Sequence, residues 1–303
     1  MKKIAVYQKS RKWTLNLIVD KLFTVGLWIV SFLIVLLILW LLYRILSRGL
    51  PFLTFDFLIG IPDEVMEGGG IGPFLFNSFY ILIISLIISL PIGIGSGIYL
   101  AEYAPDNRLT EVIRACVESL ASVPSIVFGL FGYVLFVDVF QIGLTILGAS
   151  VALSLLNLPV LTRVTEEALR AVPVDVREAS YALGVTKSQT IIKAVIPAAL
   201  SAIVTGISLA ACRAFGESAV ILLAGGTGTS GEMWDFNLLS PGGNLPVYLW
   251  YVQSEALVPD AKEIAEKSAA VLVCIILLMS TFFRIPVWWR EFRFKRKILL
   301  RRK

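Results

Sequence analysis

The stretch EASYALGVTKSQTIIKAVIP, residues 178–197, decides how the rest of this chain is organised. It is polar, charged and punctuated by glycine and proline, yet it separates two long apolar runs. Few other parts of so apolar a chain offer a soluble protein a place to bind. The role of this stretch therefore depends on what the apolar runs around it are.

The composition indicates a membrane protein. Hydrophobic residues make up 57% of the 303 residues, charged residues only 16%, and the mean hydropathy is +0.83. An ordinary globular domain carries about 25% charged residues. There is no histidine, and the spacing of Cys116, Cys212 and Cys274 fits neither a zinc site nor a disulfide framework. The expected fold is an all-α polytopic membrane protein, with the cysteines as small buried hydrophobes.

Six apolar segments predict six transmembrane helices. The first follows a basic segment, as in a signal peptide, but it is too long for a signal h-region and no small-residue cleavage site follows it. It is long enough to cross about 30 Å of hydrocarbon as a helix, so we expect it to be retained. The expected spans are residues 22–43, 74–100, 118–137, 142–161, 198–224 and 268–289.

The distribution of Lys and Arg predicts the topology. Basic residues crowd the termini, residues 1–21 and 290–303, and recur in the loop 162–197, whereas the loops 44–73 and 225–267 carry few. The positive-inside rule places the termini, the amphipathic segment 101–117 and the loop 162–197 in the cytoplasm. The transmembrane domain is then 22–289, and the basic tails contact anionic lipid rather than nucleic acid.

The loop 162–197 has the signals of two short helices. Pro173 suits the first turn of a helix, and Gly184 suits the left-handed position that ends one. Thr186, with Gln189 three residues later, predicts a capping box for the next helix, which Pro197 should interrupt at the membrane. This pattern favours a compact cytoplasmic knob, and the alternative is an ordinary connecting loop.

These residues resemble a known motif. Glu178-Ala179-Ser180, Gly184 and Ile196-Pro197 are similar to the EAA motif of type I ABC-importer permeases. Ser180 replaces the second alanine, and Ala194 stands where isoleucine is usual. In that family the loop is a coupling helix that docks into a groove on a cytoplasmic ATPase. The resemblance assigns ATPase coupling to Glu178, Ala179, Gly184 and Pro197.

The resemblance extends over most of the chain and narrows to PstA-type permease subunits of phosphate ABC transporters. It implies the type I importer fold, a bacterial or archaeal plasma membrane, a heterodimer with a related permease, two ATP-binding subunits and an external phosphate-binding protein. Residues 1–60 add little to it. The strings that carry it are MEGGGIGPFLFNS (66–78), PIGIGSGIYLAEYA (91–104), SVPSIVFGLFGY (122–133), LPVLTRVTEEALRAVP (158–173), TGISLAACRAFGESA (205–219) and NLPVYLW (244–250).

Two charges inside the fifth expected span point to a substrate pathway. Arg213 and Glu217 are four residues apart, a spacing at which two side chains meet on one helix face. A charge at mid-membrane costs about 3 kcal/mol and marks a functional pathway by default. Arginine suits a tetrahedral oxyanion because its planar fork donates two parallel hydrogen bonds. Glu217 would hold the guanidinium, and the alternative is a structural ion pair.

Two further residues are candidates for the pathway. Arg163 follows Pro159 at the cytoplasmic end of the fourth expected span. It is either a positive-inside anchor or a second anion station, and its place in the family-like string favours the pathway. Pro124 predicts a break in the third span, where Ser125 would offer a hydroxyl. The alternative for Ser125 is a packing kink.

Motifs for catalysis and nucleotide binding are missing from the sequence. The string GGTGTSG, residues 225–231, lacks the lysine of a P-loop, and GxxxxGK[ST] occurs nowhere. We expect ATP and Mg²⁺ to bind partner subunits, no cofactor or metal in this chain, and a non-enzymatic subunit that moves inorganic phosphate inward. The alternatives are a permease for another oxyanion, an ion-coupled secondary transporter, or a membrane enzyme, against which the lack of histidine argues.

Overall fold

The computed structural model describes the backbone of residues 2–63, 67–255 and 258–301, and the side chains of residues 19–285 and 289 outside those gaps. Every element in these ranges is helical, and they contain no strand. Five helices are long and apolar enough to cross a membrane, and a bent pair is a sixth candidate. The predicted all-α polytopic fold is confirmed.

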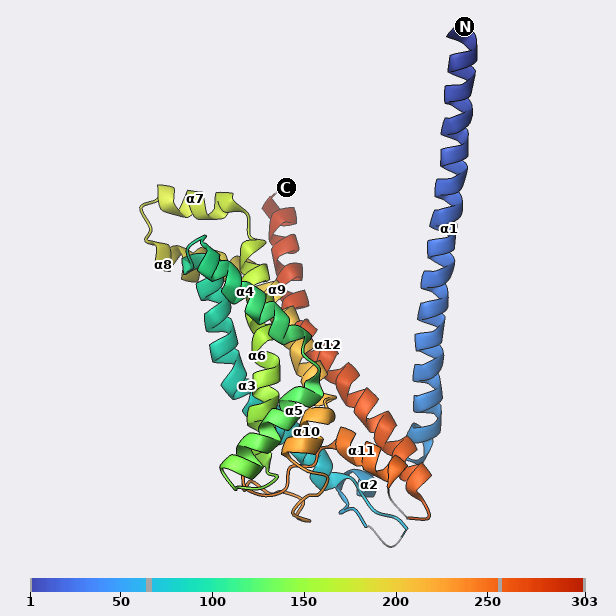
Figure 1. The fold of residues 1–303 in the computed structure, drawn as a ribbon, viewed down its shortest axis with the longest axis vertical. Helices are drawn as coiled ribbons and strands as arrows, with labels where there is room; N and C mark the ends of the chain where they lie inside the picture. Colours follow the sequence, from blue (N-terminus) through green and yellow to red (C-terminus); the bar gives the residue numbers. More distant parts are fainter. Residues whose placement is uncertain (1, 64–66, 256–257, 302–303) are drawn as a thin grey trace.

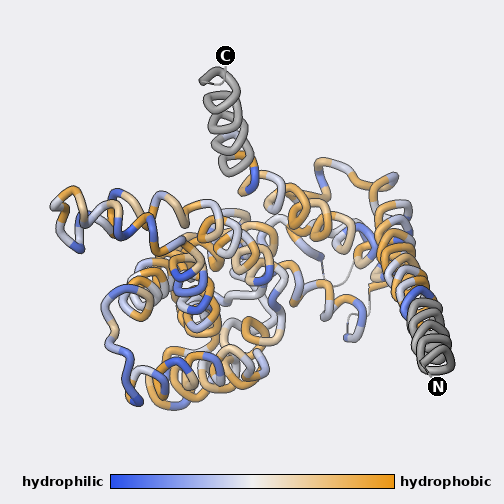
Figure 2. The backbone as a smooth tube through the Cα atoms, turned by 90° about the horizontal axis from the view of Figure 1, so that it is seen from above, coloured by the Kyte–Doolittle hydropathy of each residue, from blue (hydrophilic) through white to orange (hydrophobic). Residues whose placement is uncertain are grey.

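The first helix, α1 (Lys2–Gly49), stands to one side of the other helices (Figures 1 and 2). It meets the body at its C-terminal end, where Arg48 Nη1 lies 3.0 Å from Oε1 of Glu266 on α12. The expected span 22–43 lies within α1. The side chains of the basic segment are described only from residue 19 onward.

Helices α3 (Gly72–Ile98) and α6 (Ile146–Arg170) form the centre of the bundle. A Cβ atom at Gly93 would lie 2.7 Å from Cβ of Leu161, and one at Gly97 would lie 2.5 Å from Cβ of Thr165. The glycines of the second apolar segment therefore permit the close approach of α3 and α6. Pro91 lies inside α3 without ending it.

The third expected span, 118–137, is not one continuous helix, because it is broken at Pro124, where the sequence predicts a break. Residues Arg108–Ser122 form α4 and Ser125–Tyr133 form α5, and the two helices meet at an angle of 90°. A proline lacks a backbone N–H and forces the preceding residue out of helical geometry. Val123 is accordingly extended before Pro124, and the segment expected at 101–117 merges into α4.

The fourth expected span ends too early at residue 161, because α6 runs on to Arg170. Its buried face continues through Thr165 and Leu169, so the residues expected to open the loop at 162 still pack on the bundle. Arg163 is consequently a helical residue.

The two short helices of the predicted knob are α7 (Val174–Ala182) and α8 (Lys187–Thr190). Gly184 has the predicted left-handed backbone, with φ of +76°, and the Thr186 hydroxyl accepts the predicted cap hydrogen bond from the Gln189 amide at 3.5 Å. Pro173 is the N-cap residue of α7 rather than part of its first turn.

The prediction that Pro197 interrupts the second helix is wrong. A π-helical segment, Ile191–Val195, joins α8 to α9 (Ile196–Phe215), so that one helix runs from Lys187 to Phe215. Pro197 lies at the start of α9, where the wider π turn has already changed the hydrogen-bond pattern and the missing N–H costs little.

The fifth expected span, 198–224, is two helices, because α9 ends at Phe215 and α10 covers Ala219–Ala224. The expected outer loops also contain helices, namely α2 (Phe55–Ile59) in 44–73 and α11 (Leu245–Ser254) in 225–267. The last helix, α12 (Ala261–Arg301), begins before the expected span 268–289 and includes most of the tail. The side chains of Trp288 and of residues 290–303 are outside the described set.

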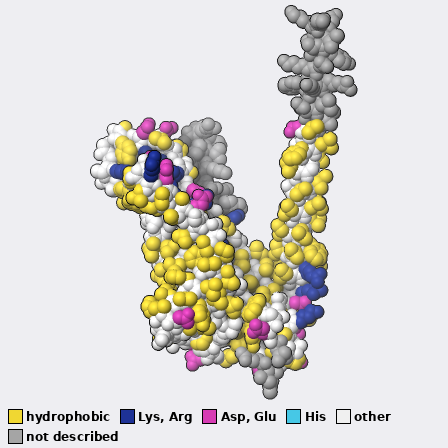
Figure 3. Space-filling model, in the orientation of Figure 1, with side chains coloured by type: hydrophobic (Ala, Val, Ile, Leu, Met, Phe, Trp, Pro, Cys, Tyr) yellow, Lys and Arg dark blue, Asp and Glu magenta, His cyan; other side chains and the backbone are white. Residues whose placement is uncertain are grey.

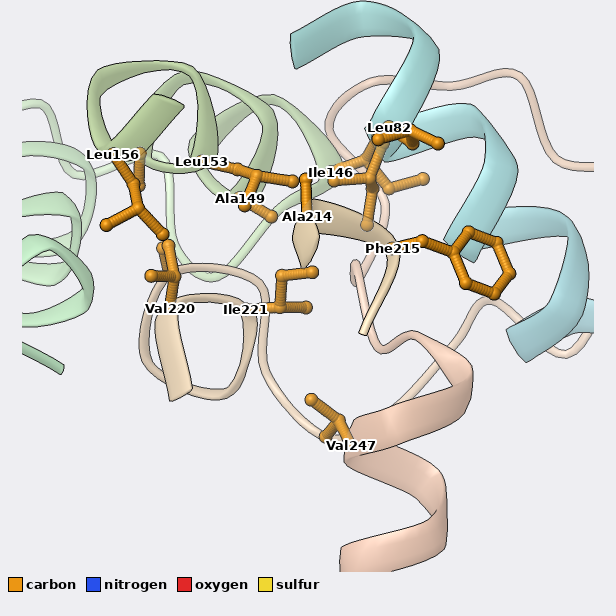
Figure 4. Packing of buried hydrophobic residues seen from close by; sticks show 13 residues of the cluster. Leu82, Ile146, Ala149, Leu153, Leu156, Ala214, Phe215, Val220, Ile221 and Val247 are labelled. Atoms are coloured by element: carbon orange, nitrogen blue, oxygen red, sulfur yellow. The ribbon is translucent and has the colours of Figure 1, made fainter. Parts of the chain in front are cut away.

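Two apolar clusters organise the body. The larger one joins α3, α6, α9, α10 and α11 (Figure 4). The second joins Phe57, Phe74, Tyr248 and Ile264, so the two outer segments pack together as one lobe. On the visible face hydrophobic side chains cover α1 and the middle of the body, whereas charged side chains gather toward the ends (Figure 3).

Candidate functional site

The break between α9 and α10 places Arg213 in the last turn of α9. Its neighbours Ala214 and Phe215 are buried in the larger apolar cluster, whereas Arg213 is exposed. The amide of Gly216 bonds the carbonyl of Cys212 at 3.4 Å and thereby closes the helix. Within the described residues, Arg213 has no hydrogen-bond or ion-pair partner.

Glu217 lies beyond the end of α9 and binds backbone instead of Arg213. Its Oε1 accepts a hydrogen bond from the Ala219 amide at 3.2 Å, at the start of α10. Its carbonyl accepts one from Nδ2 of the buried Asn244 at 3.0 Å. The expectation that Arg213 and Glu217 share one helix face is therefore wrong, because α9 stops between them at Gly216.

The exposed guanidinium of Arg213 needs a polar partner once the protein is in a membrane. Five N–H donors are available on an always-charged group. Charged side chains within membrane-spanning segments face a bundle interior or a water-filled path rather than lipid. The arrangement can therefore bind an anion by two parallel hydrogen bonds, or pair with an acidic group of a neighbouring subunit.

Arg163 is held between two carboxylates. Its Nη1 lies 2.9 Å from Oε1 of Glu118 on α4, and its Nε lies 2.8 Å from Oε1 of Glu167 on α6. The Arg163 side chain is 47% exposed, and those of Glu118 and Glu167 are 66% and 62% exposed. These two contacts use two of the five N–H donors of the Arg163 guanidinium, and the two carboxylates beside it disfavour the approach of an anion.

The structure does not bring Arg163 and Arg213 together. Val164, next to Arg163, packs against Gly206 of α9. Arg213 is two helical turns beyond Gly206, which at 1.5 Å per residue is about 10 Å along the axis. Arg163 on α6 and Arg213 on α9 are thus two separate positions along the bundle rather than one site.

Ser125 is the first residue of α5, directly after the break at Pro124. One turn later, Gly129 packs against the backbone of Ala219 and Val220 on α10. Ser125 thus lies on the helix that packs against α10, the helix that Glu217 caps. It is partly exposed.

The knob formed by α7 and α8 exposes Glu178, Ala179 and Gly184. It lies at the same end of the molecule as the N-terminal end of α1 and the C-terminal end of α12 (Figure 1). No residue of α7 is buried, and Leu183 is 83% exposed. An exposed helix that presents a large apolar side chain is a suitable surface for another protein. Pro197 lies apart from this surface, partly buried at the start of α9.

An ion pair that the sequence does not reveal lies beneath the knob. Arg177 Nη2 lies 2.6 Å from Oε1 of Glu102, and the Glu102 side chain is only 5% exposed. Arg114 similarly pairs with the mostly buried Glu166 at 2.7 Å, and Glu166 also accepts from Arg170. Arg177 and Glu102 are 75 positions apart in the sequence, so no spacing signal could have linked them.

A groove of about 520 Å³ lies inside the bend between α4 and α5. Its lining is almost entirely apolar, with Ser96 and Thr162 as the polar exceptions, so it does not suit an anion. Within the described residues, no group of three or more His, Cys, Asp and Glu side chains is placed to hold a metal ion.

A polytopic helical chain with charged residues at a helix break and an exposed knob at one end fits a membrane transport subunit. The chain belongs to the family of binding-protein-dependent transport system inner membrane components, whose model matches residues 93–288. It is thus a multi-pass permease subunit of an ABC importer. Such a permease generally works with ATPase and permease subunits and with a substrate-binding protein.

Individual relatives agree with this assignment. The chain is 41% identical to the probable ABC transporter permease protein YqgI of Bacillus subtilis, over 87% of this chain and 93% of that protein. It is 35% identical to the phosphate transport system permease protein PstA of Haemophilus influenzae, over 81% and 86%. It matches an inward-facing structure of the MetNI methionine ABC transporter with a TM-score of 0.54 and 19% identity, over 70% and 89%, which shows a shared fold.

Proposed function

We propose that this chain is the membrane-spanning subunit through which an ATP-driven importer moves inorganic phosphate into the cell. The exposed Arg213 at the break between α9 and α10 is the observation that supports an anionic substrate. Several relatives that are 30–35% identical over about four fifths of this chain bear the name of phosphate permease PstA.

In this proposal Arg213 binds the phosphate oxyanion by two parallel hydrogen bonds. Glu217, held by the start of α10, limits how tightly the anion is retained. Ser125 adds a hydroxyl at the start of α5. Arg163 forms a second station nearer the inner mouth, where phosphate exchanges with Glu118 or Glu167.

The proposed complex contains a second, related permease, two ATP-binding subunits and an external phosphate-binding protein. The knob with Glu178, Ala179 and Gly184 docks on an ATPase, and Pro197 starts the helix that carries the movement to Arg213. ATP and Mg²⁺ bind the partners, so this subunit performs no catalysis. Both termini lie in the cytoplasm, and the lobe built from 44–73 and 225–267 receives the binding protein outside.

The substrate is tested with the purified complex in proteoliposomes. Each binding protein, loaded with phosphate, phosphonate, sulfate or molybdate, is added outside while ATP is enclosed with the ATPase. We expect phosphate to stimulate ATP hydrolysis and labelled uptake more than the other oxyanions do. Stronger stimulation by another oxyanion would reassign the substrate, and uptake without ATP hydrolysis would indicate an ion-coupled transporter instead.

A further inference from the structure

Arg177 lies on the exposed helix α7, yet its own side chain turns into the body and is only 17% exposed. Its Nη2 and Nε lie 2.6 Å and 3.2 Å from Oε1 of Glu102, whose side chain is more deeply buried still. A carboxylate removed from water to this extent needs its counter-charge, because an unpaired buried charge is strongly unfavourable.

The same guanidinium binds the end of α6. Its Nη1 donates to the carbonyl of Val172 at 2.8 Å, and its Nη2 donates to the carbonyl of Leu169 at 2.9 Å. The last carbonyls of a helix lack intrahelical partners and carry the negative end of the helix dipole. Arg177 therefore pairs with the charge of Glu102 and adds hydrogen bonds to the carbonyl of Leu169, which already accepts from the Val172 amide at 3.2 Å, and to that of Val172, just beyond the end of α6.

Glu102 connects this contact to α3 and α4. It belongs to the π-helical segment Tyr99–Tyr103, which continues directly from α3. In the same segment the carbonyl of Leu100 accepts a hydrogen bond from Nη2 of Arg114 on α4 at 2.9 Å. One end of the bundle, where α3, α4 and α6 meet, is thus tied together by charged side chains, and Arg177 adds α7 to it.

Other contacts hold α7 less firmly. It has no buried residue, and Val176 packs only partly against an apolar cluster. Its link to α8 is a hydrogen bond between the hydroxyls of Ser180 and Thr190 at 2.8 Å. In contrast, α3 and α6 are packed in direct contact at Gly93 and Gly97, so they can move as one body.

We propose that Arg177, with Glu102 as its counter-charge, is the positioning residue that transmits movement of α7 to the paired helices α3 and α6. This rests on the proposed docking of an ATPase on α7. Displacement of α7 by that ATPase pulls on three points at once: the Glu102 carboxylate at the end of α3 and the two carbonyls at the end of α6. Without Arg177, α7 moves but α3 and α6 do not follow its movement.

The test separates transmission from mere stability. The neutral double variant Glu102→Gln/Arg177→Met removes the ion pair without leaving a buried charge, and such replacements are often close to neutral for stability. We expect its complex to assemble with the ATPase as the wild type does. We also expect the amount of substrate transported per ATP hydrolysed to fall by roughly five-fold or more, the range of ordinary coupling energies.

Two more variants keep the proposal falsifiable. Arg177→Lys keeps the charge but loses the planar fork that reaches both carbonyls, so assembly should persist while the transport ratio falls. Arg170→Gln is the matched control, because it removes an exposed positive charge at the same helix end, where Glu166 keeps its ion pair with Arg114, and it should keep the wild-type ratio.

The ratio is measured with whichever oxyanion the wild-type complex imports, so an error in the substrate leaves the test intact. A wild-type ratio in both the double variant and Arg177→Lys, in a complex that does hydrolyse ATP, would overturn the inference alone. If the wild type takes up substrate without ATP, both the proposed function and the inference about Arg177 are overturned.

Discussion

At the scale of a residue, Gly216 decides the contacts of Arg213 and Glu217. The four-residue spacing would bring the two side chains together on a continuous helix, but Gly216 closes α9 and leaves Glu217 to cap α10. The charge of Arg213 is consequently not neutralised within the described part of the chain. It is available for a substrate or for a neighbouring subunit.

The pathway role of Arg213 is tested by Arg213→Ala. Loss of the charge and of its paired donors should lower phosphate uptake by at least about ten-fold, because charge-assisted hydrogen bonds contribute about 1.5–3 kcal/mol each. Arg213→Lys should retain part of the uptake, since it keeps the charge without the fork. The measurement is uptake of labelled phosphate at matched levels of assembled complex.

Full uptake by Arg213→Ala would show that the residue is structural rather than part of the pathway. Arg170→Gln again serves as the control, since it removes an exposed charge outside the proposed pathway. Equal losses in both variants would point to a general effect of net charge.

At the scale of an element, the packing of α3 on α6 depends on which side of the helix a glycine faces. Gly97 faces Thr165, whereas Gly95, two residues earlier, has open space around it. Gly97→Val should destabilise the chain by about 1–3 kcal/mol through overpacking, and Gly95→Val should change its stability little. Thermal unfolding of the two variants in the same detergent measures the difference, and equal midpoints would contradict this packing.

The turn of the knob depends on the backbone of Gly184. A residue with a side chain pays about 1–2 kcal/mol to adopt its left-handed conformation, so Gly184→Val should shift α7 against α8. We expect less ATPase subunit to copurify with this variant than with the wild type. Lys193→Gln, an exposed change in the following segment, is the control. If the amount of copurified ATPase is unchanged, binding of the ATPase does not depend on the conformation of this turn.

Elements that depend on local signals were predictable from sequence, and those that depend on distant contacts were not. Gly184 and Thr186 make the knob predictable because a helix cap depends only on residues within its own turn. The extension of α6 to Arg170 and the pairing of Arg177 with Glu102 depend on packing between segments far apart in the chain. Pro124 predicts a helix break, but the sequence around it does not give the angle of 90° between the helices on either side.

The whole molecule exposes far more apolar surface than a chain that works alone. The side chains along α1 from Leu22 to Leu41 are mostly exposed, and so are many on α4 and α5. The composition predicts a membrane protein, but which of these apolar faces contact lipid and which contact another subunit depends on the assembled complex. The same limit applies to Arg213, whose surroundings depend on that arrangement.

The isolated position of α1 also bears on how the protein is made. Its main contacts with the rest of the body are with α12, at the opposite end of the sequence. Contacts between such distant segments form late, because the chain between them must be present first. Helix α1 therefore waits for α12, and the junction of Arg48 with Glu266 is completed only after α12 has been synthesised.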